Sequence, residues 1–240
     1  MTLSIVGRDP SSAAFGVAVA TADLFVGSGV PHAMTGVGAI ATQARRNTDL
    51  GVVGLKLLEL GLSPKSAIEG LLAEDAAPQL RQVAGIDRHG RTFSFTGSEC
   101  TGWAGSVEGA HSVSLGNLLV GREPLERMAE RFEALTGCWL GVRLLVALAA
   151  GVAAGGDRRG HRSAALLVTP MVSAPGGRAQ PDALLYRTSL RVDDHAEPLA
   201  ELNRLFQLLL DDREHLGAPM PGTEGWRSLS TASVSGEEDD

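Results

Sequence analysis

The sequence predicts an α+β fold, a four-layer αββα sandwich in which two mainly antiparallel sheets lie between helical layers. Turn residues join successive strand patterns into hairpins, and helices stand in groups between the strand pairs. A doubly wound parallel sheet would instead alternate strands and helices one by one. With 240 residues, of which 44% are hydrophobic, the chain can bury one substantial core.

The first half of the chain contains two hairpins and two helices. Asp9-Pro10-Ser11-Ser12 forms a turn between strands at 2–8 and 15–21, because proline fixes φ and Asp and Ser bond to their own backbone. Ser63-Pro64 begins a helix in the favoured N-cap and N1 order. The other expected elements are a strand at 38–43, helices at 51–61 and 64–74, and strands at 82–87 and 91–96 around Gly90.

The second half is expected to be mainly helical with two more strands. Residues 98–122 contain five glycines and are expected to be an irregular stretch that lines a site. Helices follow at 123–136, 139–153 and 197–213, with strands at 163–169 and 184–192. Residues 1–216 are expected to form one domain, and 217–240, rich in Gly, Pro, Ser and acidic residues, a disordered acidic tail.

Composition argues against several classes of function. The net charge of −7 and the 4% aromatic content do not favour nucleic-acid binding. Two cysteines and single histidines do not make a disulfide framework or a metal site, so we expect no metal. The longest apolar run, 144–154, is too short for a membrane span, and no leader opens the chain, so we expect a cytoplasmic protein.

The first strand carries a candidate nucleophile. Thr2 and Ser4 share one face of the strand, because side chains alternate. Removal of Met1 before the small Thr2 would expose an α-amine with a pKa of about 7.7–8.0, able to take the proton of its own hydroxyl. The alternative is that Thr2 simply begins an edge strand, as β-branched residues often do.

The chain also resembles the DUF1028 family, which is grouped with the N-terminal nucleophile (Ntn) hydrolases. The resemblance runs from residue 2 to about residue 210 and implies an αββα sandwich and, by analogy, hydrolysis of an amide bond. It rests on 2–10, 16–20, 41–44, 95–97, Cys100, 103–105, Gly116-Asn117, 155–160, 163–166 and 190–195. The chain departs from the family pattern at Leu115, where glutamine is usual, at His161-Arg162, where Arg-Gln is usual, and near Leu50, where tyrosine is common.

Three residues are candidates for catalysis. Thr2 is the expected nucleophile with its own amine as base. Ser4 is the alternative nucleophile or a hydrogen-bonding partner behind Thr2. Asn117 can donate to an oxyanion while Gly116 lets the backbone approach closely, although an asparagine there can equally cap a turn.

Gly116 and four further residues are candidates for binding substrate. Thr42 and Gln43 end an apolar strand, where they can bond substrate or simply anchor a loop. Asp157 and Arg158, in a glycine-flanked turn, can clamp a carboxylate or lower the pKa of the Thr2 amine. The alternative for these two is an internal ion pair that orders the turn.

Two other constellations are weaker. Cys100 with His111 is a rival nucleophile and base, although a lone cysteine is usually a small hydrophobic residue. His195 follows two aspartates and opens a helix, which is more typical of a capping cluster than of a metal site.

Together these observations predict a cofactor-free hydrolase of an amide, cyclic amide or ureido-type C–N bond in a small molecule. The alternative is a non-catalytic small-molecule-binding or scaffold protein on the same fold, which Leu115 favours. We expect a homodimer through the apolar helices at 51–73 or 139–153.

Overall fold

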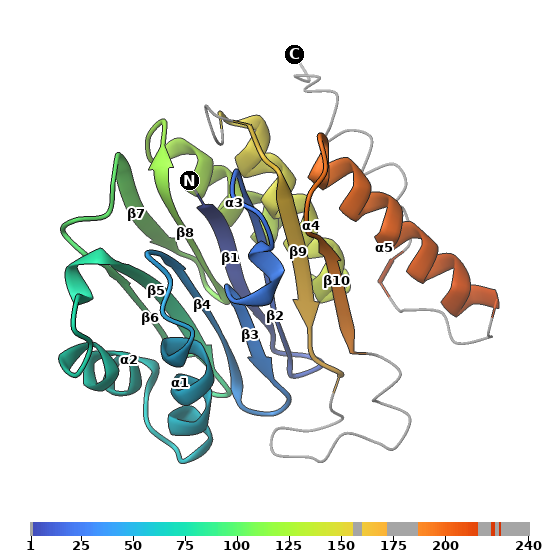
Figure 1. The fold of residues 1–240 in the computed structure, drawn as a ribbon. Helices are drawn as coiled ribbons and strands as arrows, with labels where there is room; N and C mark the ends of the chain where they lie inside the picture. The colour runs from blue at the N-terminus through green and yellow to red at the C-terminus, as the bar shows by residue number, and fades with distance from the viewer. Residues whose placement is uncertain (1, 156–159, 172–186, 216–221, 224–225, 227–240) are drawn as a thin grey trace.

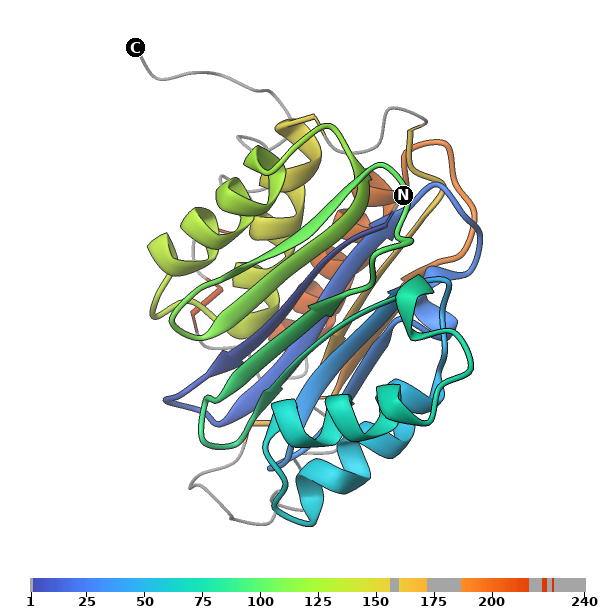
Figure 2. The same ribbon diagram turned by 90° about the vertical axis from the view of Figure 1, so that its left-hand side faces the viewer.

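The computed structural model describes residues 2–155, 160–171, 187–215, 222, 223 and 226. Two antiparallel sheets lie face to face between helices, which confirms the predicted sandwich (Figure 1). The helices α3, α4 and α5 cover the outer face of the six-stranded sheet, whose strand order is β10-β9-β2-β1-β8-β7. The helices α1 and α2 cover the four-stranded sheet, with order β3-β4-β5-β6, and Figure 2 shows them on the opposite side from α3 and α4.

The elements follow the chain in hairpins separated by helices. The six-stranded sheet comprises β1 (Thr2–Asp9), β2 (Ala14–Thr21), β7 (Trp103–Glu108), β8 (Ser112–Leu119), β9 (Ser163–Val168) and β10 (Thr188–Val192). The four-stranded sheet comprises β3 (Pro31–Met34), β4 (Gly38–Ala44), β5 (Arg81–Asp87) and β6 (Thr92–Thr96). The helices are α1 (Asp49–Glu59), α2 (Pro64–Ala73), α3 (Glu123–Ala134), α4 (Leu140–Ala153) and α5 (Pro198–His215).

Both predicted hairpins and all five predicted helices are present, with ends shifted by a few residues. Ser63 is the N-cap of α2, and its Oγ accepts a hydrogen bond from the Ser66 amide at 3.1 Å. The strand β3 was not predicted. It begins at Pro31 and is separated by Gly29 and Val30 from the single-turn 3₁₀ helix Val26–Ser28.

The expectation of an irregular stretch at 98–122 is wrong, because most of it forms the strands β7 and β8. Glycines of these strands make room for large neighbouring side chains: a Cβ on Gly116 would lie 2.6 Å from Leu119 Cδ1, and one on Gly105 2.9 Å from Trp103. Gly105 and Gly116 therefore allow close side-chain packing within the strands and do not mark turns. The consequence for function is large, since β8 pairs with β1 and places Asn117 opposite Thr2.

Three apolar clusters fill the spaces between the four layers. Leu3 and Ile5 pack under the helices α3 and α4, whereas Val6 faces the second sheet. The strand β1 thus alternates as predicted, and Thr2 and Ser4 point into the space between the sheets. Burial of each large aliphatic side chain contributes about 1.5–3 kcal/mol, so the register of β1 is strongly fixed.

Helix α4 is interior, so the expectation that 139–153 offers a dimer surface is wrong. Nearly all of its side chains are buried between α3 and the six-stranded sheet. In the predicted tail, the structure describes Gly222, Thr223 and Trp226, and the ring of Trp226 packs edge-on against Phe206 at 4.8 Å. Within the described residues, no helix combines the length and apolar character needed to cross a bilayer.

Candidate functional site

Thr2 lies at one end of the sandwich, between the two sheets. It pairs with Thr21 of β2 on one side and with Asn117 of β8 on the other. The residue is 7% exposed, and its Oγ1 lies 3.3 Å from Thr21 Oγ1. Two cavities of about 270 and 290 Å³ meet at Thr2. Because Thr2 lines both cavities, a small molecule that enters either of them meets this residue.

The two cavities share part of their walls. Thr2, Asp23, Ala44 and Arg45 line both of them. The 270 Å³ cavity, here named the amide cavity, is completed by Leu80, Glu99, Cys100, Thr101, Asn117 and Leu118. The 290 Å³ cavity, here named the arginine cavity, is completed by Thr21, Leu24, Val26, Val30, Gln43 and Arg46.

A buried network of amides lies behind Thr2 and joins the two sheets. Ser4 Oγ donates to Gln43 Oε1 at 2.5 Å, and Gln43 Nε2 donates to Gln82 Oε1 at 2.8 Å and to the Thr2 carbonyl at 3.4 Å. Gln82 is the hub: its Nε2 contacts the carbonyl oxygens of Gly116 at 2.8 Å and Gly105 at 3.1 Å. Because these bonds cross from one sheet to the other, they fix the position of β1 relative to β4 and β5.

Within the described part of the chain, the Asn117 side-chain amide keeps one N–H that the network does not use. Asn117 Nδ2 donates to Gln82 Oε1 at 3.0 Å, and an amide nitrogen carries two hydrogens. Both hydrogens of Gln43 Nε2 are used inside the network. Asn117 is 4% exposed and lines the amide cavity. Its second N–H is therefore available for an oxygen that approaches Thr2.

Backbone strain is concentrated around the cavities. Four non-glycine residues of the described part have positive φ, and Ala44 (φ 62°) and Leu118 (φ 59°) both line the amide cavity. A third, Phe25 (φ 59°), is flanked by Leu24 and Val26 of the arginine cavity. Such conformations cost about 1–3 kcal/mol each and persist where the surrounding structure enforces them. They turn the chain sharply directly after Gln43 and Asn117.

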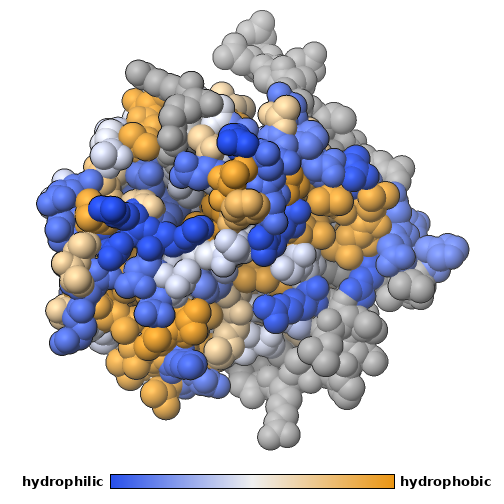
Figure 3. Space-filling view, in the orientation of Figure 1, coloured by the Kyte–Doolittle hydropathy of each residue, from blue (hydrophilic) through white to orange (hydrophobic). Residues whose placement is uncertain are grey.

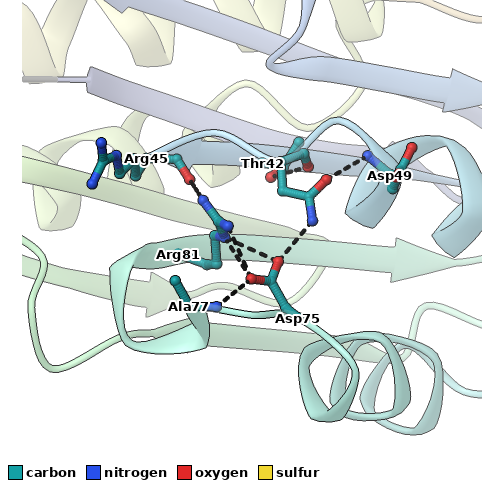
Figure 4. Close-up of polar contacts among 7 residues, drawn as sticks. Thr42, Arg45, Asp49, Asp75, Ala77 and Arg81 are labelled. Carbon is teal, nitrogen blue, oxygen red and sulfur yellow. Dashed lines mark hydrogen bonds and ion pairs between the residues drawn. The ribbon is translucent and has the colours of Figure 1, made fainter.

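An ion-pair cluster holds the loop that follows β4 (Figure 4). Arg81 donates from Nε and Nη2 to the Asp75 carboxylate and from Nη1 to the Arg45 carbonyl. Asn47 Nδ2 donates to Asp75 Oδ2 at 2.7 Å. The Arg81 hydrogen bonds, with smaller contributions from Asn47 and the Ala77 amide, lower the pKa of Asp75 to about 2.

Thr42 belongs to this loop anchor and not to the cavities. Its side chain is buried on the face of β4 opposite to that of Gln43, and its Oγ1 donates to the Asn47 carbonyl at 3.0 Å. The structure therefore places Gln43, and not Thr42, beside Thr2. Thr42 has the anchoring role that the sequence left open.

Ser4 and Gly116 lie near Thr2 but outside both cavities. Ser4 is fully buried and is held by Gln43, and Gly116 contributes its carbonyl oxygen to the Gln82 hub. Leu115 faces the second sheet within the apolar cluster between the sheets. Asp157 and Arg158 lie outside the described residues.

The predicted rival pair, Cys100 with His111, is not formed. Cys100 lines the amide cavity, whereas His111 precedes β8 at its far end, where the His111 backbone carbonyl accepts a hydrogen bond from the Arg8 amide at 2.9 Å. His111 adjoins the Gly7–Ser112 pair, which lies five strand residues, about 17 Å, from the Thr2–Asn117 pair at the cavity. Burial raises the pKa of the Cys100 thiol, which donates to the Arg81 carbonyl at 3.4 Å. A raised pKa keeps the thiol protonated and weakly nucleophilic.

His195 has the capping role that the sequence favoured. Its Nδ1 accepts the Glu197 amide at 3.0 Å just before α5. Among the residues that the structure describes, no three His, Cys, Asp or Glu side chains are grouped closely enough to hold a metal ion.

Sequence reasoning missed Gln82, Asp23, Glu99 and the two arginines that follow β4. Gln82 had a usable signal, since it shares a strand face with Ala84 and Ile86, which point into the apolar space between the sheets. A glutamine at an inward position needs partners, and here they form the hub. Arg45 and Arg46 had no comparable signal, because only the fold brings their loop to Thr2.

Comparison with known proteins agrees with this architecture. The crystal structure of protein SPO2555 from Silicibacter pomeroyi, described with the family model DUF1028, is similar with a TM-score of 0.76. The two chains are 34% identical over 86% of this chain and 85% of that chain. A comparison with curated proteins gave no match. The family model described as "Family of unknown function (DUF1028)" matches residues 2–202, and the chain belongs to this family.

Proposed function

We propose that this protein hydrolyses an amide, cyclic amide or ureido-type C–N bond of a small molecule, with Thr2 as an N-terminal nucleophile. One observation carries the proposal: the Thr2 side chain lies where two cavities meet, directly opposite an asparagine with an unused N–H. The cavities are slightly smaller than the common range for ligand pockets, about 300–1,000 Å³, which suits a small substrate.

The reaction requires Thr2 to carry a free α-amine, after removal of Met1. The amine nitrogen takes the proton from Thr2 Oγ, and Oγ attacks the carbonyl carbon. The carbonyl oxygen becomes an oxyanion, which accepts the free Asn117 N–H. The C–N bond then breaks, the leaving nitrogen takes the proton from the ammonium group, and an ester to Thr2 remains. Water hydrolyses the ester, releasing the acid and restoring the hydroxyl.

Ser4 supports this chemistry as a positioning residue. Its hydroxyl holds Gln43 Oε1, which directs Gln43 Nε2 toward Gln82 and the Thr2 carbonyl. Gln82 in turn holds Asn117. The chain of bonds sets the angle at which Asn117 faces Thr2, and preorganised donors need no rearrangement during the reaction.

A second candidate function is reversible binding of a small molecule without catalysis. Leu115 favours it, because an apolar side chain stands one residue before Gly116, where the family usually has a glutamine amide. The side-chain amides of Gln43, Gln82 and Asn117 mostly bond to one another and to the backbone, which leaves few donors for a ligand in the cavities.

A matched pair of variants at Thr2 tests catalysis against binding. Thr2→Ser keeps a hydroxyl beside the amine, and Thr2→Ala removes it while leaving a small residue that still permits loss of Met1. Hydrolysis of a panel of N-acyl amino acids, N-carbamoyl amino acids and lactams is measured by release of amine or ring opening. We expect Thr2→Ser to retain activity and Thr2→Ala to lose at least about 1,000-fold in kcat. Equal turnover in both variants would refute Thr2 as nucleophile.

The proposal includes a cytoplasmic location and no cofactor. Both cysteines are free, as in proteins of reducing compartments. The amine and hydroxyl of Thr2, Asn117 and water supply every group that the reaction uses.

A further inference from the structure

We propose that Arg45 and Arg46 bind an anionic group of the substrate, so that the natural substrate carries a carboxylate next to the bond that is cleaved. This inference rests on the proposed function and names its substrate class. Arg45 lines both cavities that meet at Thr2, and Arg46 lines the arginine cavity. Both side chains lie at the exposed mouth of the site, where a ligand can reach them.

The charges around Thr2 differ between the two cavities. The arginine cavity has two cations, Arg45 and Arg46, against one carboxylate, Asp23. The amide cavity has one cation, Arg45, against two carboxylates, Asp23 and Glu99. An anionic substituent is therefore favoured in the arginine cavity. The amine released by C–N cleavage, which is protonated at neutral pH, is favoured on the side of Glu99.

The two guanidinium groups have no carboxylate partner among the described residues, although the chain has a net charge of −7. Several other arginines of the described part, among them Arg81, Arg162 and Arg191, have a carboxylate within 2.9 Å, whereas Arg88 donates to a backbone carbonyl. Planar guanidinium groups match carboxylates with two parallel hydrogen bonds. Two unpaired arginines at the mouth of a cavity are thus suited to a carboxylate brought by the ligand.

The loop that carries the arginines is built to hold them in place. The Arg45 amide donates to the Leu80 carbonyl at 3.1 Å, and its carbonyl accepts from Arg81, which Asp75 holds in turn. Figure 4 shows the Arg45 side chain pointing away from this cluster. Arg46 lies over Gly29, where a Cβ would be 3.1 Å from Arg46 Cδ and Nε. Because hydrogen bonds already hold the backbone of this loop, the loop loses less conformational entropy when a ligand binds the arginine side chains.

Binding measurements on matched ligands test the inference. N-acyl and N-carbamoyl amino acids are compared with their uncharged methyl esters, by calorimetry on Thr2→Ala so that no turnover interferes. We expect the acids to bind at least about tenfold more tightly than the esters. Arg45→Ala and Arg46→Ala, each in the Thr2→Ala background, should remove the preference, and the remaining binding should depend less on salt.

Arg88→Ala is the matched control, because Arg88 lies in the β5–β6 turn at the other end of β5 from Arg81 and, among the described residues, its side chain bonds only the Glu59 carbonyl. It should keep the preference for acids. Arg45→Lys and Arg46→Lys, which keep the charge, should retain part of it and guard against loss through misfolding. Equal affinity for acids and esters, or an unchanged preference in both alanine variants, would overturn the inference. Tight binding of acids with no hydrolysis by the unmodified protein would instead overturn the proposed function alone.

Discussion

Asn117 shows how one side chain gains a role through its position in a pair of strands. Its pairing opposite Thr2 comes from the register of β1 with β8, and its orientation comes from Gln82. The sequence offered Asn117, Thr2 and Gln43 as candidate site residues, because polar residues at strand ends are visible in the pattern, and the structure brings the three together. It did not identify Gln82, whose hydrogen-bond partners lie on the four strands β4, β6, β7 and β8.

Replacement of Asn117 tests the oxyanion role. Asn117→Ala removes the free N–H, so kcat should fall about 100- to 1,000-fold while KM changes little. Steady-state kinetics on a hydrolysed member of the substrate panel measure both constants. Asn117→Asp is the matched control of size, and it should also fail because a carboxylate cannot donate to an oxyanion. Full activity in either variant would assign the oxyanion to another donor.

Replacement of Gln82 tests the hub of the network. Gln82→Leu removes the acceptor of Asn117 Nδ2, one of the two acceptors of Gln43 Nε2, and the side-chain donor to the carbonyls of Gly105 and Gly116 in a buried space. We expect a loss of about 2–4 kcal/mol in the free energy of unfolding, since each unsatisfied group costs about 1–3 kcal/mol and some regain water. Urea denaturation measures this loss. Gln207→Leu, on the exposed side of α5, is the control and should change stability by less than about 0.5 kcal/mol.

At the scale of elements, local signals were sufficient for most of the fold. Turn residues marked both hairpins, and Ser63-Pro64 marked the start of α2. The strands β7 and β8 were missed because their glycines resemble loop residues, whereas in the structure they accommodate the Trp103 and Leu119 side chains. The sequence alone does not show that the side chains of Trp103 and Leu119, two and three residues away, fold back over Gly105 and Gly116.

The loop after β4 should be sensitive to acid through Asp75. The folded-state pKa of about 2 lies below the ordinary value of 3.8, so the carboxylate stabilises the fold at neutral pH and this contribution is lost as pH falls from about 4 to about 2. Asp75→Asn should lower stability at pH 7 by about 1–2 kcal/mol, allowing for solvent screening at this partly open site.

Denaturation at several pH values measures this contribution. The difference between the unmodified protein and Asp75→Asn should shrink below pH 4. A difference that stays constant from pH 7 to pH 2.5 would show that the Asp75 charge does not stabilise the loop. Substrate affinity should fall in the same variant, because Arg45 would lose its backbone anchor.

At the scale of the whole molecule, apolar side chains gather over α1 and α2, at the lower left of Figure 3. Val52, Leu60 and Leu62 are exposed there, and Leu60 reaches 77%. Since α4 is interior, this face is the remaining candidate for the expected homodimer. Leu60→Glu should convert a dimer to a monomer in light scattering after gel filtration, and Lys65→Glu, exposed on α2, should not. A monomeric unmodified protein would exclude the homodimer.

Labelling with a β-lactone, followed by mass spectrometry of the intact chain and its peptides, tests the central claim most directly. If Thr2 is an N-terminal nucleophile, the chain lacks Met1 and carries one adduct on Thr2, while Thr2→Ala carries none. A chain that retains Met1, or an adduct on Cys100 in the same cavity, would contradict the account.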